Sequence, residues 1–277
     1  MTNINQEIRD AFNSAAITYT DAAKVQCEIG RRLLARLDYF KINPRFILDL
    51  GCGPGVLTSL LQARYPDACV VGLDLAFLML QQAKSSHPLL VHADMCALPF
   101  NFGSFDLVFA NQVIHWAPCF KSLLQEIHRV MRIDGCFMFS TLGPDTMDEL
   151  KQAFAAIDGY AHTHDFVDMH ERGDALLAAQ FIDPVMDMEH LTVHYQKPQD
   201  LLWSIKAQGV RNLHEQRRLG LMGKVAWGRL LGALEAQKTP EGQYPLTYEV
   251  IYGHAWKGAQ QRNDDGETFF SLDGLLR

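Results

Sequence analysis

A repeated pattern over residues 46–142 constrains the fold of this 277-residue chain more than any other feature. A short apolar run ends in a small or acidic residue, a helical pattern follows, and the same order then returns. Such alternation is typical of a parallel β-sheet covered by helices, because buried strands of that kind are nearly continuous apolar runs. It predicts a doubly wound α/β fold. The expected strands are 46–50, 69–74, 89–92, 105–110 and 136–141.

Helical patterns flank this core on both sides. Residues 5–38 have the spacing of two amphipathic helices with a break near Ala15–Thr20, and another helix is expected to begin at Asp145. The runs 185–195 and 246–256 are predicted as two late strands, with a mostly helical stretch between them that would cover a pocket as a lid. The predicted units are an N-terminal helical cap (1–45), a core (46–196), a helical lid insertion (197–243) and a last strand with a C-terminal tail (244–277).

Composition limits the class of protein and its partners. Hydrophobic residues make up 48% of the chain and charged residues 21%, which suits a globular protein with a sizeable core. The net charge of −7 argues against general binding to nucleic acid, because such binding needs an excess of Lys and Arg. The six cysteines form no C-x-x-C pair, the N-terminus lacks a signal-peptide pattern, and no apolar stretch approaches the ~20 residues of a membrane helix. We expect a monomeric, cytoplasmic protein that does not bind membranes.

The turn after the first predicted strand is the most informative segment. In Ile47–Gly55, an apolar strand leads into three glycines at alternate positions, and a helix follows. A dinucleotide-binding fingerprint places its third glycine three residues after the second. In this turn the third glycine comes two residues after the second, so the spacing differs. Asp49 would repel a pyrophosphate but suits an ammonium group, whereas the alternative is an ordinary glycine-rich turn with a solvated carboxylate. The expected ligand-binding residues of this turn are Asp49, Gly51, Cys52, Gly53 and Gly55.

Two further acidic residues follow predicted strands. Asp74 ends the second strand, where a carboxylate can accept the hydroxyls of a ribose, and the alternative role is N-cap of the next helix. Asp94 follows the third strand and suits an adenine amino group, with a plain surface carboxylate as the alternative. Leu75 would lie against the adenine face and Met95 would present its backbone amide. Together with the glycine turn, these positions favour a nucleoside site.

Further motifs accompany these positions: Leu98-Pro-Phe100, Phe105-Asp106, Glu126-x-x-Arg129-Val and Gly135. With the glycine turn and the two acidic strand ends, they resemble the class I S-adenosylmethionine-dependent methyltransferases. The resemblance implies a Rossmann-like fold, S-adenosyl-L-methionine as cofactor and S-adenosyl-L-homocysteine as product. It places Asn111 and Gln112, after the fourth strand, beside the methionyl group, with His115 and Trp116 nearer the acceptor.

A narrower resemblance extends over nearly the whole chain. The motifs that carry it are Phe12-x-x-Ala-Ala16-x-x-Tyr19 with Gln26, Thr141-Leu-Gly-Pro-Asp145, Ile205-Lys-Ala-x-Gly209 and Tyr244-Pro-Leu-Thr-Tyr-Glu249. In these motifs the chain resembles the malonyl-[acyl-carrier protein] O-methyltransferases of biotin synthesis, which esterify the free carboxylate of malonyl thioester so that it can be elongated towards pimeloyl thioester. The resemblance implies a seven-stranded, mostly parallel sheet of order 3-2-1-4-5-7-6, and it implies that Tyr19 and Gln26 close over the cofactor.

The implied reaction needs few catalytic groups. Its nucleophile is the substrate's own carboxylate, which is ionised at neutral pH, so no general base is required. Catalysis then depends on alignment and on the exclusion of water. We expect Tyr19, His115 and Trp116 at the acceptor, with core packing as the alternative for Trp116. We also expect Arg211 or Arg217 to hold the malonyl carboxylate or the carrier phosphate.

A basic segment lies in the predicted lid. Residues 197–229 hold seven Lys or Arg against Asp200 and Glu215, which leaves +5 in a chain that is −7 overall. Complementary charge speeds the encounter with an acidic partner. We therefore expect this basic patch to dock malonyl-[acyl-carrier protein], and the alternative is a solvated helix face.

Other functions stay open as alternatives. A methyltransferase of a small molecule, such as a quinone precursor or a free dicarboxylic acid, would need the core but not the basic patch. A non-catalytic regulator would bind the cofactor or a nucleotide and transfer nothing. The histidines at 162, 164, 170, 190 and 194 lack the spacing of known zinc motifs, so we expect no metal site.

Overall fold

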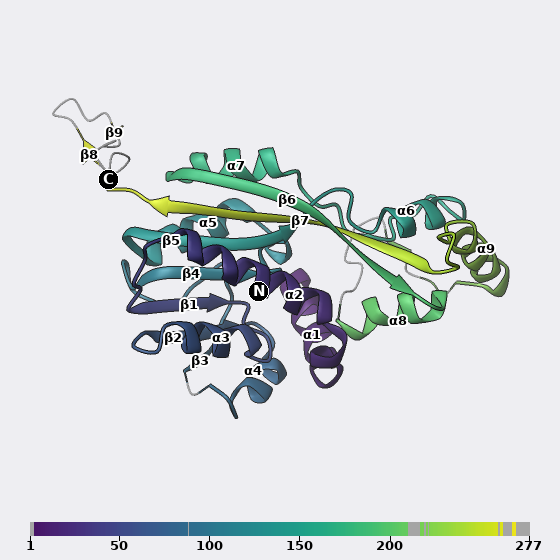
Figure 1. Cartoon of the computed structure of the whole chain (residues 1–277), viewed down its shortest axis with the longest axis horizontal. Coiled ribbons are helices and arrows are strands. Elements are labelled where there is room, and N and C mark those ends of the chain that lie inside the picture. Colours follow the sequence, from purple (N-terminus) through teal and green to yellow (C-terminus); the bar gives the residue numbers. More distant parts are fainter. Residues whose placement is uncertain are drawn as a thin grey trace.

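The computed structural model describes residues 3–87, 89–209, 217–218, 220, 222–259, 261–262 and 268–269. A central sheet has helices packed on both of its faces (Figure 1). Among the described residues, no helix is both long and apolar enough to span a membrane.

The predicted strand order is confirmed. Seven strands follow the order β3-β2-β1-β4-β5-β7-β6. The first five strands in sequence pair in parallel, whereas β7 runs antiparallel to both of its neighbours. The strands are β1 (Phe46–Leu50), β2 (Cys69–Asp74), β3 (Leu90–His92), β4 (Phe105–Asn111), β5 (Met131–Leu142), β6 (Phe181–Tyr195) and β7 (Tyr244–Lys257), with a separate pair β8 (Gln261–Arg262) and β9 (Thr268–Phe269).

The helices follow most of the predicted pattern. The helix expected from Asp145 begins three residues later, at Asp148, and one helix, Met169–Ala178, occupies a stretch for which none was predicted. The helices are α1 (Asn3–Ala22), α2 (Lys24–Arg36), α3 (Val56–Arg64), α4 (Phe77–Ala83), α5 (Phe120–Val130), α6 (Asp148–Ala155), α7 (Met169–Ala178), α8 (Pro198–Ala207) and α9 (Lys224–Glu235), with short 3-10 helices η1 (Leu37–Tyr39) and η2 (Ile114–Trp116).

The predicted break within the N-terminal helices is wrong. α1 continues through Ala15–Thr20, and the chain breaks at Ala23 instead. Ala15 and Ala16 are buried, and Ala16 packs against Ala76 and Met79 beside α4. Packing of these small residues stabilises the helix across a segment whose β-branched residues suggested a break, because tertiary contacts outweigh local propensity.

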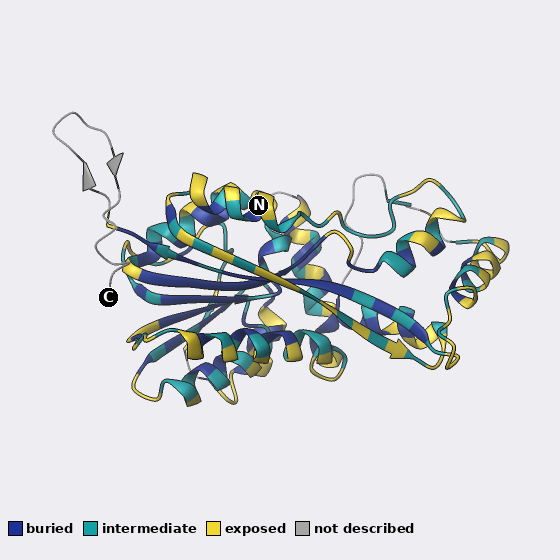
Figure 2. Cartoon of the chain, turned by 45° about the horizontal axis from the view of Figure 1, so that its top comes forward, coloured by how far each residue is buried: buried dark blue, intermediate teal, exposed yellow. Residues whose placement is uncertain are grey.

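Alternation along each strand divides the apolar side chains between two cores. In β4, Leu107 and Phe109 join the core that includes α2 and α3, whereas Val108 and Ala110 join the core that includes α5 and α7. All four side chains are fully buried, and Figure 2 shows the same burial along the central strands. The sheet is therefore enclosed between two apolar layers, as in other doubly wound folds.

The β6–β7 pair extends beyond the rest of the sheet. β7 pairs with β5 only from Val250 to Trp256, whereas its pairing with β6 continues to Tyr244. This extension projects past the carboxyl end of β5, and α6, α8 and α9 gather around it (Figure 1). α8 also packs against α1. Side chains of β7 and α8 are thereby brought to the edge of the sheet where ligands of α/β folds bind.

Candidate active site

Three cavities meet at the carboxyl edge of the sheet, and Tyr19 of α1 lines all three. The first cavity surrounds Asp74 and Asp94, the second surrounds His115, and the third surrounds Asp49. Tyr19 therefore marks the junction of the three. The other residues that line more than one cavity are Gly51, Gly53 and Asn111 (first and third), Phe12, Gln112 and Trp116 (first and second), and Gln26 (second and third).

The glycine turn has the backbone conformation that its sequence predicts. Gly51 and Gly53 have φ values of 71° and 54°, in the left-handed region that favours glycine. A Cβ atom on Gly51 would lie only 2.3 Å from the Val113 side chain. Cys52 is buried between them and points away, towards Gly72 of β2. The turn thus presents bare backbone to the first and third cavities.

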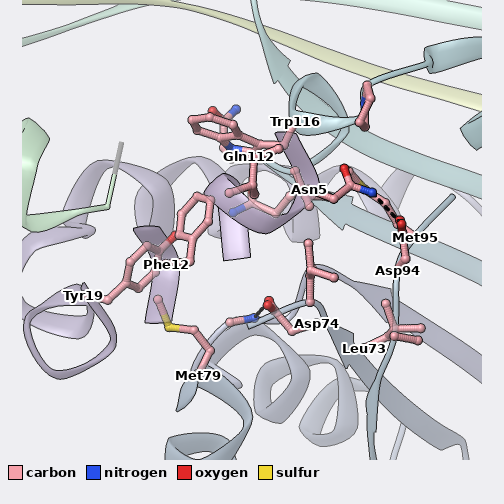
Figure 3. Close-up of a pocket in the computed structure, with 18 residues that line it drawn as sticks. Asn5, Phe12, Tyr19, Leu73, Asp74, Met79, Asp94, Met95, Gln112 and Trp116 are labelled. Carbon is pink, nitrogen blue, oxygen red and sulfur yellow. Dashed lines mark hydrogen bonds between the residues drawn. The ribbon is translucent and has the colours of Figure 1, made fainter. Parts of the chain in front are cut away.

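Asp74 holds this turn in place through hydrogen bonds to backbone N–H groups. Its carboxylate accepts the N–H groups of Gly53 (2.8 Å) and Ala76 (2.7 Å) and faces the first cavity (Figure 3). Burial raises the pKa of Asp74, and the two N–H donors oppose that rise. The N-cap of α4 is Ala76, so the alternative role of Asp74 as the N-cap is wrong. The carboxylate is instead positioned at a strand end with capacity to accept further hydrogen bonds.

Asp94 lies at the far end of the first cavity. It accepts hydrogen bonds from the Asn5 side chain (2.7 Å) and from the Cys96 N–H (2.8 Å), as Figure 3 shows for Asn5. Leu75 and Met95 line the same cavity. The alternative of a plain surface carboxylate does not fit a side chain in this position. Asn5 was not anticipated from the sequence, because its contact with Asp94 joins residues 89 positions apart.

The third cavity holds two buried acceptors that lack a cation. Asp49 is 1% exposed, accepts a hydrogen bond from the Thr58 hydroxyl (2.6 Å), and has no ion pair among the described residues. Burial raises the pKa of Asp49 to about 7. Gln26 donates through its amide nitrogen to Gln208 (2.7 Å), while its side-chain oxygen is buried and accepts no hydrogen bond from the described residues. Both oxygens suit an ammonium group.

The second cavity opens on the other side of Tyr19. Burial and then the charge of Arg172 lower the pKa of His115 to about 3, so its imidazole is neutral at physiological pH. Its Nδ1 lies 3.3 Å from the Thr141 hydroxyl. Trp116 lines the first and second cavities and contacts the Phe12 ring edge-on, with centroids 5.3 Å apart. Trp116 is thus a cavity wall.

Three predicted site residues do not line these cavities. Gly55, with φ of 82°, starts α3, and a Cβ there would lie 2.9 Å from Ala83 of α4. Arg217 donates to Glu7 of α1 (3.0 Å). Arg211 lies outside the described residues. All other predicted site residues line at least one cavity: Tyr19, Gln26, Asp49, Gly51, Cys52, Gly53, Asp74, Leu75, Asp94, Met95, Asn111, Gln112, His115 and Trp116.

Three of the five histidines weighed as metal ligands pair with carboxylates. His162 pairs with Asp158 (2.7 Å), and His170 pairs with Asp168 (2.8 Å). His190 lies with Asp145 and Glu249 so that their ligand atoms fall within 4.8 Å of one another. Those last three residues do not line the three cavities.

The three cavities together suit one elongated ligand and one acceptor. The carboxylates of Asp74 and Asp94 could accept hydrogen bonds from a nucleoside, and that of Asp49 could hold an ammonium group, so Tyr19 would lie beside the middle of such a ligand. Burial and the nearby Asp74 carboxylate raise the pKa of Tyr19, so it stays a neutral phenol. The acceptor would approach this junction through the second cavity.

Comparisons with known proteins agree with this arrangement. A methyltransferase-domain family model matches residues 48–139. A malonyl-[acyl-carrier protein] O-methyltransferase of Legionella pneumophila is 50% identical over 99% of this chain and 99% of its own length. A protein of the same name from Gallionella capsiferriformans is 44% identical over 98% of this chain and 97% of its own length. The solved structure of Haemonchus contortus phosphoethanolamine N-methyltransferase 2 with S-adenosyl-L-methionine has the same fold, with a TM-score of 0.55 at 15% identity over 91% of this chain and 60% of that one. The chain therefore belongs to the malonyl-[acyl-carrier protein] O-methyltransferase family.

Proposed function

We propose that this protein uses S-adenosyl-L-methionine to methylate the free carboxylate of malonyl-[acyl-carrier protein], as an early step of biotin synthesis. The observation that carries the proposal is the junction at Tyr19, where cavities suited to a nucleoside, an ammonium group and an acceptor meet. Relatives that carry this name match almost the whole chain, including the β6–β7 extension and α8 that wall the second cavity.

The residues of the first and third cavities fit the cofactor. Asp74 would accept the ribose hydroxyls and Asp94 the adenine amino group. Asp49 and the unpartnered oxygen of Gln26 would hold the methionyl ammonium, with the Asn111 carbonyl beside them. When bound, S-adenosyl-L-methionine supplies an electrophilic methyl group on a sulfonium. The left-handed glycines Gly51 and Gly53 let the backbone approach it closely.

The residues at the junction align the acceptor and exclude water. Tyr19, Phe12 and Trp116 form an aromatic wall between the cofactor cavities and the second cavity. A desolvated, correctly oriented carboxylate is more reactive than a hydrated one. Because that carboxylate is already ionised, the neutral His115 is not needed as a base, and its role is to shape and hydrogen-bond the acceptor side.

The basic patch at 197–229 is proposed as the docking surface for the acidic carrier protein. Lys197, Lys206, Lys224 and Arg229 are all exposed on or beside α8 and α9. Complementary charge there would speed encounter without changing the chemistry. We further propose that the protein is a cytoplasmic monomer and that the segment 197–243 acts as a lid over the acceptor.

A methyl-transfer assay tests the proposed function. Purified protein with methyl-labelled S-adenosyl-L-methionine would be offered malonyl carrier protein, malonyl-coenzyme A and free malonate in parallel. We expect transfer to both thioesters, with the highest kcat/KM for the carrier protein. Transfer to free malonate alone would indicate a small-molecule methyltransferase. Cofactor binding with no transfer to any acceptor would indicate a non-catalytic binding protein.

A further inference from the structure

The second cavity is distinguished by the charge of its lining. Among the described residues that line it, none is Asp or Glu, and Lys206 is the one Lys or Arg. Its other polar side chains are amides, hydroxyls and imidazoles, which are His115, His162, Thr163, His164, Gln26, Gln112, Gln208, Tyr19 and Tyr248. A cationic side chain and neutral hydrogen-bond donors, without a carboxylate beside them, favour an anionic guest over a cationic one. The cavity therefore suits an acceptor that carries a carboxylate.

A buried hydroxyl in this cavity lacks a partner. Tyr248 lies on the extended part of β7, is 1% exposed, and its side-chain oxygen makes no hydrogen bond in the described part of the chain. The Gln208 amide lies beside it without completing a hydrogen bond of normal geometry. Burial raises the pKa of Tyr248, so the group stays a donor. An unpaired buried donor is unfavourable for folding, which indicates that a bound group satisfies it.

A second donor comes from α8. Lys206 lies in the last turn of this helix, lines the second cavity and has no ion pair among the described residues. By contrast, Arg217 and Arg218, from the same basic patch, pair with Glu7 and Asp158. Among the described cations of the patch, Lys206 is thus the one that lines the cavity and is placed to meet an anion there.

We propose that Lys206 and Tyr248 form the subsite that recognises the free carboxylate of the acceptor. Lys206 attracts the carboxylate, and the Tyr248 hydroxyl donates to one of its oxygens, so that the other oxygen is left for the junction at Tyr19. The methyl ester carries no charge, so the same subsite binds the product more weakly than the substrate. This assignment rests on the proposed function and takes over the role expected for Arg217, which pairs with Glu7.

A binding experiment without turnover tests this subsite. Calorimetry would measure the affinities of malonyl-pantetheine and of its carboxamide analogue for protein saturated with S-adenosyl-L-homocysteine. We expect the wild-type protein to prefer the carboxylate. Lys206→Met and Tyr248→Phe should each reduce that preference by about tenfold or more, because a charge-assisted hydrogen bond is lost. The affinity for S-adenosyl-L-homocysteine should not change.

Tyr244 provides a matched control on the same strand. It is also buried, but its hydroxyl donates to Glu235 of α9. Tyr244→Phe should lower the thermal midpoint and keep the carboxylate preference, whereas Tyr248→Phe should keep or raise the midpoint and lose the preference. Lys41→Met, at an exposed position before β1, controls for loss of one positive charge.

The outcomes separate the subsite from the proposed function. A wild-type preference that survives in both variants overturns the subsite and leaves the proposed function standing. A wild-type protein that binds the carboxylate no better than the carboxamide overturns both. The subsite is supported if the variants lose the preference for the carboxylate while they stay folded. Their thermal midpoints and their affinity for S-adenosyl-L-homocysteine show whether they are folded.

Discussion

Asp49 is a buried carboxyl group whose charge depends on its ligand. Burial raises its pKa from 3.8 to about 7, and in the free protein only the Thr58 hydroxyl offsets that effect appreciably. Because the folded pKa lies above the unfolded one, this group stabilises the fold fully below about pH 4, and that contribution is lost as the pH rises through about 7. A cation beside Asp49 would reverse the preference and favour the carboxylate.

Cofactor affinity should therefore depend on pH. Binding the methionyl ammonium requires Asp49 to lose its proton, so the affinity for S-adenosyl-L-homocysteine should fall about tenfold between pH ~8 and pH ~6. Calorimetry across this range measures the effect. Asp49→Asn should bind more weakly and with a much flatter pH dependence, whereas an equally steep dependence in that variant would assign the proton to another group.

At the residue scale, the sequence predicted the lining of the first and third cavities better than that of the second. Their place after predicted strands indicated that the glycine turn, Asp74 and Asp94 lie together, because the carboxyl ends of parallel strands meet at one edge of the sheet. Lys206 and Tyr248 belong to motifs that indicated the family, yet nothing local in those motifs reveals a shared cavity. Their meeting depends on the length of the β6–β7 extension and on the packing of α8.

At the scale of elements, α1 packs against α8, and we call this contact the α1–α8 seam. It joins the helix that carries Tyr19 to the helix that lines the second cavity. Gly209 follows α8 with φ of 74°, and a Cβ there would lie 3.0 Å from the Ala15 side chain and 3.2 Å from the Ala11 carbonyl oxygen. α1 carries Phe12 and Tyr19 into the cavities. The close approach at Gly209 therefore positions the aromatic wall relative to the acceptor side.

Gly209→Ala should separate these helices. We expect it to lower the free energy of unfolding by about 1–3 kcal/mol, because the added methyl strains the backbone and overpacks the seam. It should also weaken binding of S-adenosyl-L-homocysteine. Urea unfolding and calorimetry measure the two effects.

Gly228 is the matched control for this change. It lies inside α9, and a Cβ there meets nothing within 4 Å. Gly228→Ala should raise the free energy of unfolding by up to about 1 kcal/mol through helix propensity and leave cofactor binding unchanged. Equal stability effects at both glycines would contradict a packed seam at Gly209.

Most elements could be predicted, and the exceptions have physical reasons. β1 occupies the predicted residues and α3 follows the glycine turn as predicted, because a buried strand and an amphipathic helix have distinct apolar periods. α1 continues where its local sequence suggested a break, since Ala15 and Ala16 are held by long-range packing. α7 lies in a stretch rich in charged residues and His, whose apolar pattern is weak, so its helix could not be read from periodicity.

At the scale of the whole molecule, charge is distributed unevenly. The segment 197–229 is basic within a chain of net charge −7. Lys224 and Arg229 are exposed on α9, which packs against α6 and α8 near the end of the β6–β7 extension (Figure 1). In the proposed function, this arrangement would separate recognition of an acidic carrier from methyl transfer at Tyr19.

Carrier docking should therefore be sensitive to salt. The kcat/KM for malonyl carrier protein should fall several-fold as ionic strength rises, whereas that for malonyl-pantetheine should change little. Replacing Lys224 and Arg229 together by Glu should lower kcat/KM for the carrier by about tenfold and spare malonyl-pantetheine. Parallel losses for both substrates would place these residues outside a docking role.

The most direct measurement follows the methyl group in a single turnover. Protein preloaded with methyl-labelled S-adenosyl-L-methionine would be mixed with a slight excess of malonyl carrier protein, and the carrier would then be isolated and treated with mild base. We predict that the label moves to the carrier and is released by base as methanol, because a carboxyl methyl ester is hydrolysed under these conditions. Label that stays on the cofactor, or that reaches the carrier in a base-stable form, would contradict carboxyl methylation at the junction of the three cavities.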